Sequence, residues 1–236
     1  MAVDLIARLA EDPPRAALFL DVDGVLAPIV ARPEDARVPD GTRAELRRLH
    51  DRYALVACIT GRASDDARKI VGVPELTYVG NHGHELAPES EAWHGRLREL
   101  LSEVEWPHLE DKGLTATLHY RGLDEAAVLP QLEAIAERSR EAGFVARFGR
   151  KALEIIPPIE ANKGTAIRML LARHELRRAL ASGDDTTDLD AFRALDGLEL
   201  AVRVAVSSEE GPPELRAAAD IVVANPPEFV SLLQQL

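Results

Sequence analysis

The sequence predicts an α/β protein whose doubly wound parallel sheet is interrupted by an inserted α+β domain. Apolar runs of strand length alternate with segments of helical periodicity at both ends of the chain, as in doubly wound sheets. Between about residues 85 and 158 this alternation gives way to a mixed pattern with a two-residue rhythm. The length of 236 residues suits one α/β unit with a modest insertion. We expect residues 1–84 and 159–236 to form the core and residues 85–158 the insertion.

The first half of the core opens with residues 16–20, an unbroken apolar run that predicts a central strand covered by helices. A helix is expected over residues 42–53, because Leu46, Leu49 and Tyr53 recur at helical spacing. Two further strands are expected over residues 54–59 and 76–79, with a short helix over residues 64–71 between them.

The insertion is expected to hold helices over residues 93–104 and 124–142, and strands over residues 114–120, 144–148 and 152–156. Its alternating β-formers favour an antiparallel sheet with one face in water. Pro157 and Pro158 mark its exit. The α/β pattern then resumes, with helices expected over residues 163–174 and 187–195, strands over residues 179–182, 199–206 and 221–223, and a last helix that runs to residue 236.

Composition narrows the class of protein. The chain has 28 Lys and Arg against 40 Asp and Glu, a net charge of −12, which argues against nucleic acid or an anionic membrane as a partner. Cys58 has no second cysteine with which to form a disulfide, and no apolar run reaches 18 residues. The N-terminal residues lack the pattern of a secretory leader, so a cytoplasmic location is expected.

Carboxylates follow two of the predicted strands. Asp21 and Asp23 come directly after the first strand, and Asp184 and Asp185 follow a later one, with Asp188 in the next helical turn. Ligands of open α/β sheets bind outside such strand ends, and crowded carboxylates favour a hard divalent ion such as Mg²⁺. The alternative for each motif alone is a turn or a helix N-cap, but N-capping accounts for one acid and not for three.

Cations near these acids would meet an anionic substrate. Lys163 stands just after a predicted N-cap, where its charge opposes the helix dipole, so we expect it to bind phosphate. Thr60, Gly61 and Arg62 end the second strand and offer a hydroxyl group and backbone N–H groups to the same phosphate. A surface lysine and an ordinary strand-to-helix turn are the alternatives.

The motifs DVDGVLAPI, ITGR, NKG and GDDTTD occur in this order and together resemble the haloacid dehalogenase superfamily of phosphatases. The stretches YVGNHGHE, EDKGLTATLHYR and GRKALEIIP further resemble the trehalose-6-phosphate phosphatase family, and the likeness runs from about residue 16 to 192. The resemblance implies that Asp21 attacks phosphorus and that Asp23 transfers protons. It implies Mg²⁺ held by Asp21, the Asp23 backbone carbonyl group and Asp184, with Asp185 and Asp188 in support, while Thr60 and Lys163 stabilise the phosphoryl group.

The resemblance also implies that the insertion is a cap that binds the sugar. The sugar-binding candidates in the family-like stretches are Glu110, Lys112, Arg121, Arg150 and Glu154, and His82 is expected at the mouth of the site. The implied substrate is trehalose 6-phosphate, in the last step of trehalose biosynthesis, with functional coupling to trehalose-6-phosphate synthase. A surface charge is the alternative for each cap residue.

Two positions depart from the family pattern. Val25 stands where the first motif usually has Thr, and Leu189 stands where an acid is usual, so fine positioning is in question rather than the reaction. Two other functions stay open. One is a capped phosphatase for sucrose phosphate or mannosyl phosphoglycerate, and the other is a catalytically silent subunit that binds trehalose 6-phosphate and regulates a synthase.

Overall fold

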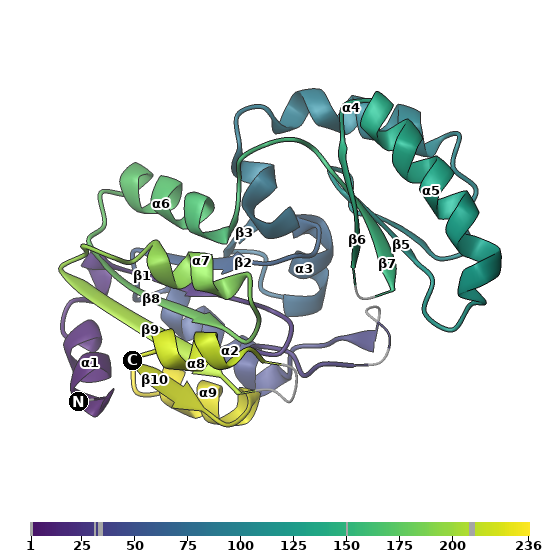
Figure 1. The fold of residues 1–236 in the computed structure, drawn as a ribbon. Helices are drawn as coiled ribbons and strands as arrows, with labels where there is room; N and C mark the ends of the chain where they lie inside the picture. The colour runs from purple at the N-terminus through teal and green to yellow at the C-terminus, as the bar shows by residue number, and fades with distance from the viewer. Residues whose placement is uncertain (1, 31, 33–34, 150, 208–210) are drawn as a thin grey trace. The chain divides into compact units, whose positions relative to one another are not determined.

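The computed structural model describes residues 2–30, 32, 35–149, 151–207 and 211–236, and the chain divides into two compact units (Figure 1). One unit, the core, comprises Met1–Gly83 and Ala161–Leu236, and the other, the insertion, comprises His84–Glu160. The insertion therefore leaves the core after one half of the sheet and returns to it before the other half.

The core holds a six-stranded sheet in which each paired neighbour is parallel, in the order β10-β9-β8-β1-β2-β3. This confirms the predicted doubly wound parallel sheet. Strand β1 lies in its middle and is buried at every position, as its apolar sequence predicts. The strands are β1 (Ala16–Leu20), β2 (Leu55–Ile59), β3 (Thr77–Val79), β8 (Arg178–Gly183), β9 (Leu200–Val206) and β10 (Ile221–Val223).

Helices cover both faces of this sheet (Figure 1). Helices α1, α2 and α9 pack on one face, where Leu18 and Leu20 of β1 meet Leu9, Leu46 and Phe229. Helices α6 and α7 lie on the other face. The α-helices of the core are α1 (Ala2–Ala10), α2 (Asp40–His50), α3 (Ser64–Val71), α6 (Lys163–Arg173), α7 (Asp188–Arg193), α8 (Pro213–Ala218) and α9 (Pro226–Leu233). A 3₁₀ segment, Pro13–Arg15, precedes β1, and a second, Asn81–Leu86, leads from β3 of the core into the insertion.

The insertion is an antiparallel sheet in the order β4-β5-β7-β6, packed against two helices. Leu118 and Leu153 of the sheet share an apolar core with Leu97 of α4 and Leu132 of α5. Because side chains alternate along each strand, the opposite face, here called the polar face, carries Glu110, Thr117, Glu154 and Arg147, together with Val145 and Ile156. The elements are α4 (Ser90–Leu101), β4 (Leu109–Asp111), β5 (Ala116–His119), α5 (Glu125–Glu141), β6 (Val145–Gly149) and β7 (Ala152–Ile156).

The structure adds α1, β4 and α8, which were not among the expected elements, although Leu5, Ile6 and Leu9 of α1 recur at helical spacing. Strand β4 has three residues and helix α8 has six, which is too short for either pattern to repeat. Helix α4 begins at Ser90, before Trp93 where it was expected, because Ser90 and Glu91 are not part of its apolar stripe. Among the described residues no helix has the length and apolar character of a membrane span.

Candidate active site

The acidic site begins where two neighbouring strands end. Strands β1 and β8 pair in parallel with Phe19 opposite Ala181, so the loops that follow them leave the same edge of the sheet. Carboxylate oxygens of Asp21, Asp184 and Asp188 all lie within 4.8 Å of one another, and the three residues are buried. Acids that are far apart in the sequence are therefore brought within reach of a single cation.

Lys163 is the cation of this cluster. Its Nζ lies 2.6 Å from Oδ1 of Asp188 and 3.1 Å from Oδ1 of Asp21, and its side chain is only 2% exposed. The Asn162 side chain accepts a hydrogen bond from the Thr165 backbone N–H in a capping box, which starts α6 at Lys163. Burial lowers the pKa of Lys163, but the charges of Asp188, Asp21 and Asp185 and the hydrogen bond to Asp188 together raise it above its ordinary value, so this ammonium group stays charged.

Asp188 organises the loop after β8. Its Oδ2 accepts hydrogen bonds from the backbone N–H groups of Asp184 (3.0 Å) and Asp185 (3.1 Å). Oδ1 of Asp185 accepts from the Thr187 backbone N–H (2.7 Å) and hydroxyl group (2.6 Å). The pKa of Asp185 is lowered although burial raises it, because Lys163 and the Thr187 hydrogen bonds favour its ionised form. Asp188 and Asp185 thus hold the loop that presents Asp184.

Crowding of the acids is visible in their pKa values. Burial is the largest cause that raises the pKa of Asp21 well above its ordinary value, Lys163 opposes it, and Asp188 and Asp184 add to it. Burial, followed by the charges of Asp188 and Asp185, raises the pKa of Asp184 to about 7. A hard divalent cation would relieve this repulsion, and carboxylate oxygens are the ligands that Mg²⁺ prefers. The donor set therefore fits Mg²⁺.

Two glycines permit this close approach. Gly24 has a φ of 75°, and a Cβ atom there would lie 2.2 Å from Oδ2 of Asp184. A Cβ atom on Gly183 would lie 2.1 Å from Cγ of Asp188. Any larger residue at either position would push an acid of the cluster out of place.

The end of β2 contributes the second part of the site. Thr60 is 1% exposed, and its Oγ1 accepts a hydrogen bond from the Arg62 backbone N–H at 3.2 Å. The Arg62 side chain donates to both oxygens of Asp23, at 2.6 and 2.8 Å, while phosphate binding by the backbone of this turn stays a prediction. The His82 ring lies against Gly61, where a Cβ atom would approach it to 2.5 Å.

The predicted sugar-binding residues lie in the insertion. Glu110 on β4 is 3.7 Å from Nζ of Lys112 and 3.1 Å from Nε2 of His119. Arg121 is exposed in the turn after β5. Glu154 on β7 is paired with Arg147 of β6 at 2.7 Å, and Arg150 lies outside the described residues.

The register of this sheet places two residues that were not among the sequence candidates, Thr117 and Arg147, beside Glu110 and Glu154. Glu110 pairs with Thr117, Thr117 with Glu154, and Glu154 with Arg147, so four polar residues form one row across the four strands. The two-residue alternation of β5 and β6 could have placed Thr117 and Arg147 on the face of Glu154. The row gives the polar face of the insertion both acidic and basic hydrogen-bonding groups.

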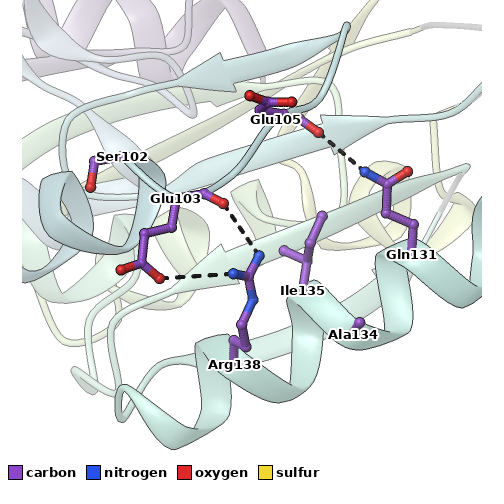
Figure 2. A pocket seen from close by; sticks show the side chains of 7 residues that line it. All are labelled: Ser102, Glu103, Glu105, Gln131, Ala134, Ile135 and Arg138. Atoms are coloured by element: carbon purple, nitrogen blue, oxygen red, sulfur yellow. Dashed lines mark hydrogen bonds and ion pairs between the residues drawn. The ribbon is translucent and has the colours of Figure 1, made fainter.

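A pocket of about 320 Å³ lies elsewhere in the insertion, beside α5 (Figure 2). Arg138 points across it, with its Nη1 3.8 Å from Oε2 of Glu103, and Gln131 donates to the Glu105 carbonyl group. The described candidate residues for sugar binding are not among those that line it. The lining residues are Ser102, Glu103, Glu105, Gln131, Ala134, Ile135 and Arg138.

Comparison with known proteins gives consistent results. The family model described as Trehalose-phosphatase matches residues 19–225. The chain is 32% identical to the trehalose-phosphate phosphatase of Mycobacterium avium, with 77% of this chain and 51% of that protein aligned. It is also 32% identical to an uncharacterized glycosyl hydrolase of Mycobacterium tuberculosis, over 94% of this chain and 18% of that protein. A crystal structure of a trehalose-6-phosphate phosphatase related protein matches with a TM-score of 0.67 and 26% identity, covering 92% of this chain and 95% of that one.

The parallel sheet with acidic loops at its strand ends, interrupted by a small antiparallel domain, defines a class of proteins that shares its fold with a haloacid dehalogenase-like hydrolase of Bacteroides thetaiotaomicron, at a TM-score of 0.61 and 14% identity. Within that class, the chain belongs to the trehalose-phosphatase family. It spans about half the length of the Mycobacterium avium phosphatase and less than a fifth of the Mycobacterium tuberculosis protein.

Proposed function

We propose that the chain is a Mg²⁺-dependent phosphatase that hydrolyses trehalose 6-phosphate to trehalose and inorganic phosphate. The observation that carries this proposal is the convergence of Asp21, Asp184 and Lys163 at one edge of the sheet. Membership of the trehalose-phosphatase family supports the choice of substrate.

In the first half of the proposed reaction, a carboxylate oxygen of Asp21 forms a bond to phosphorus as the bond from phosphorus to the sugar oxygen breaks. Asp23 gives its proton to that departing oxygen, which leaves as a trehalose hydroxyl group. In the second half, water attacks phosphorus and loses a proton to Asp23. The bond between Asp21 and phosphorus breaks, which releases phosphate and restores both carboxyl groups.

Lys163 and Thr60 stabilise the phosphoryl group in this scheme. Negative charge collects on the equatorial oxygens during transfer, so a buried ammonium group beside Asp21 lowers the barrier and offsets the repulsion between carboxylate and phosphate. The Thr60 hydroxyl group adds a hydrogen bond.

The metal would be held by Asp21, the Asp23 backbone carbonyl group and Asp184, with Asp185 in support. When bound, Mg²⁺ supplies positive charge that polarises the phosphoryl oxygens. Asp188 is engaged with Lys163 and with two backbone N–H groups, so we assign it to shaping the loop.

We further propose that the polar face of the cap sheet binds the sugar. Glucose hydroxyl groups both donate and accept hydrogen bonds, and the row from Glu110 to Arg147 offers partners of both kinds. A cytoplasmic location, functional coupling to trehalose-6-phosphate synthase, and the absence of nucleic-acid or membrane binding stay predictions from the sequence.

The test is phosphate release from a panel of sugar phosphates, with and without Mg²⁺. We expect the highest kcat/KM for trehalose 6-phosphate, and loss of activity on chelation. Higher values for sucrose phosphate or mannosyl phosphoglycerate would assign another substrate. Binding of trehalose 6-phosphate with no phosphate release would indicate a regulatory subunit.

A further inference from the structure

Arg62 is bound between two carboxylates of the core. Its Nε and Nη2 donate to Oδ2 and Oδ1 of Asp23, at 2.6 and 2.8 Å, and its Nη1 donates to Oδ2 of Asp66 at 3.2 Å. The Arg62 side chain is 11% exposed, whereas Asp23 is 40% and Asp66 is 52% exposed. The least exposed member of this group is therefore the cation in its centre.

The contact between Arg62 and Asp23 is bidentate, which fixes the plane of the carboxylate as well as its position. A lysine in place of Arg62 would supply the positive charge but not the pair of parallel donors that binds both carboxylate oxygens. Three of the five guanidinium N–H groups, one on each nitrogen, donate to the carboxylates of Asp23 and Asp66. These contacts favour an action on Asp23 over a direct action on phosphate.

Asp66 holds Arg62 from the other side. It lies in the first turn of α3, four residues after Arg62, and this spacing brings its carboxylate into an ion pair with the Arg62 side chain. Neighbouring Asp65 lies in the same turn and is exposed, and the structure gives no contact between it and Arg62. Asp65 and Asp66 therefore share charge and helix position but differ in the contact to Arg62.

We propose that Arg62 is a positioning residue that fixes the Asp23 carboxylate for proton transfer, and that Asp66 positions Arg62. This inference rests on the proposed function, in which Asp23 moves a proton to the sugar oxygen and later from water. Proton transfer depends on placing the carboxylate within hydrogen-bond reach of each oxygen in turn. The contact with Asp66 leaves the guanidinium group fewer ways to rotate away from Asp23.

The test compares R62A, R62K, D66N, the double variant R62A/D66N and the control D65N. Each is assayed with trehalose 6-phosphate and with 4-nitrophenyl phosphate, and inorganic phosphate is titrated as a competitive inhibitor. We expect kcat of R62A to fall by about 100-fold, within the range of general acid–base catalysis. KM and the inhibition constant for phosphate should stay within about twofold, because the phosphate site is intact. R62K should recover only part of kcat.

D66N should lower kcat by roughly threefold to tenfold in the wild-type background and have no effect in R62A, because residues that act through one another are not additive. D65N should match wild type. Circular dichroism and the melting temperature of each variant show whether it is folded.

A weaker phosphate inhibition constant in R62A, with kcat retained, would overturn the inference and make Arg62 a phosphate ligand. A full effect of D66N in the R62A background, or an equal effect of D65N, would overturn the role of Asp66. If the wild type hydrolyses 4-nitrophenyl phosphate but not trehalose 6-phosphate, the proposed substrate fails, and the same variants still test the positioning of Asp23. A wild type inactive on both substrates would contradict the proposed function and the inference together.

Discussion

Lys163 is a buried cation whose loss would leave two buried carboxylates without their partner. Replacing it by methionine, which has a similar length, should lower the free energy of unfolding by about 3 kcal/mol. It should also abolish phosphate release, because the ammonium group faces Asp21. Urea denaturation and a phosphate assay measure the two effects.

The control for this substitution is Arg168→Met. Arg168 lies on the same helix, α6, and is exposed. Its replacement should change stability by less than about 0.5 kcal/mol and leave activity unchanged. Equal effects of the two substitutions would contradict a special role for Lys163.

At single residues, the sequence indicated the acids but not all of their partners. Asp21 and Asp184 could be predicted because each directly follows an apolar strand. The partnership between Asp23 and Arg62 could not, because it depends on how two loops turn after their strands. Asp66 gave no signal, since an acid in the first turn of a helix is common.

The start of α6 couples helix stability to the placement of Lys163. Asn162→Ala removes the side-chain cap and should cost about 1 kcal/mol of unfolding free energy. It should also lower kcat, because Lys163 is the first residue of the helix. Thermal unfolding and steady-state kinetics test both expectations.

Asn225→Ala offers a matched comparison. Asn225 caps α9 by accepting a hydrogen bond from the Glu228 backbone N–H, at 3.0 Å. Its replacement by alanine should therefore lower the free energy of unfolding by a similar amount, about 1 kcal/mol. The kcat of the Asn225→Ala variant should equal that of the wild type. A kcat reduced to the same extent in both variants would show that lost stability, rather than the position of Lys163, explains the effect.

The loop after β1 depends on Gly24. Gly24→Ala places a Cβ atom against Asp184 at a positive φ, so it should lower stability by at least about 1 kcal/mol and weaken Mg²⁺ activation. Gly41→Ala is the control, because a Cβ atom at Gly41 in α2 has open space around it. Magnesium titrations of activity distinguish the two, and an unchanged activation constant in Gly24→Ala would argue against a metal beside this loop.

Some elements were predicted with their observed bounds, and others were missed. Helix α3 and strands β7 and β10 have the expected bounds. Strand β4 escaped prediction although it carries Glu110. Its three residues gain their order from pairing with β5, which is a tertiary effect.

For the whole molecule, the acidic cluster links stability, pH and metal. Burial and the charges of Asp188 and Asp185 raise the pKa of Asp184 from 3.8 to about 7. Between these values the folded state binds a proton that the unfolded chain has released, so this group lowers stability as pH rises toward 7. Mg²⁺ must displace that proton at low pH but not at high pH.

We therefore expect MgCl₂ to raise the melting temperature more at pH 8 than at pH 6. A thermal-shift series with and without metal measures this, and Asp184→Asn should lose most of the difference. A metal effect that is the same at both pH values in the wild type would contradict the assignment of Asp184 as a ligand.

The central claim is that Asp21 attacks phosphorus within a Mg²⁺-bound acidic site. Phosphate release from trehalose 6-phosphate by wild type and Asp21→Asn, at saturating Mg²⁺ and with both proteins shown to be folded, tests it most directly. The wild type should release phosphate and the variant should release none above background. A variant that turns over at the wild-type rate would contradict the account.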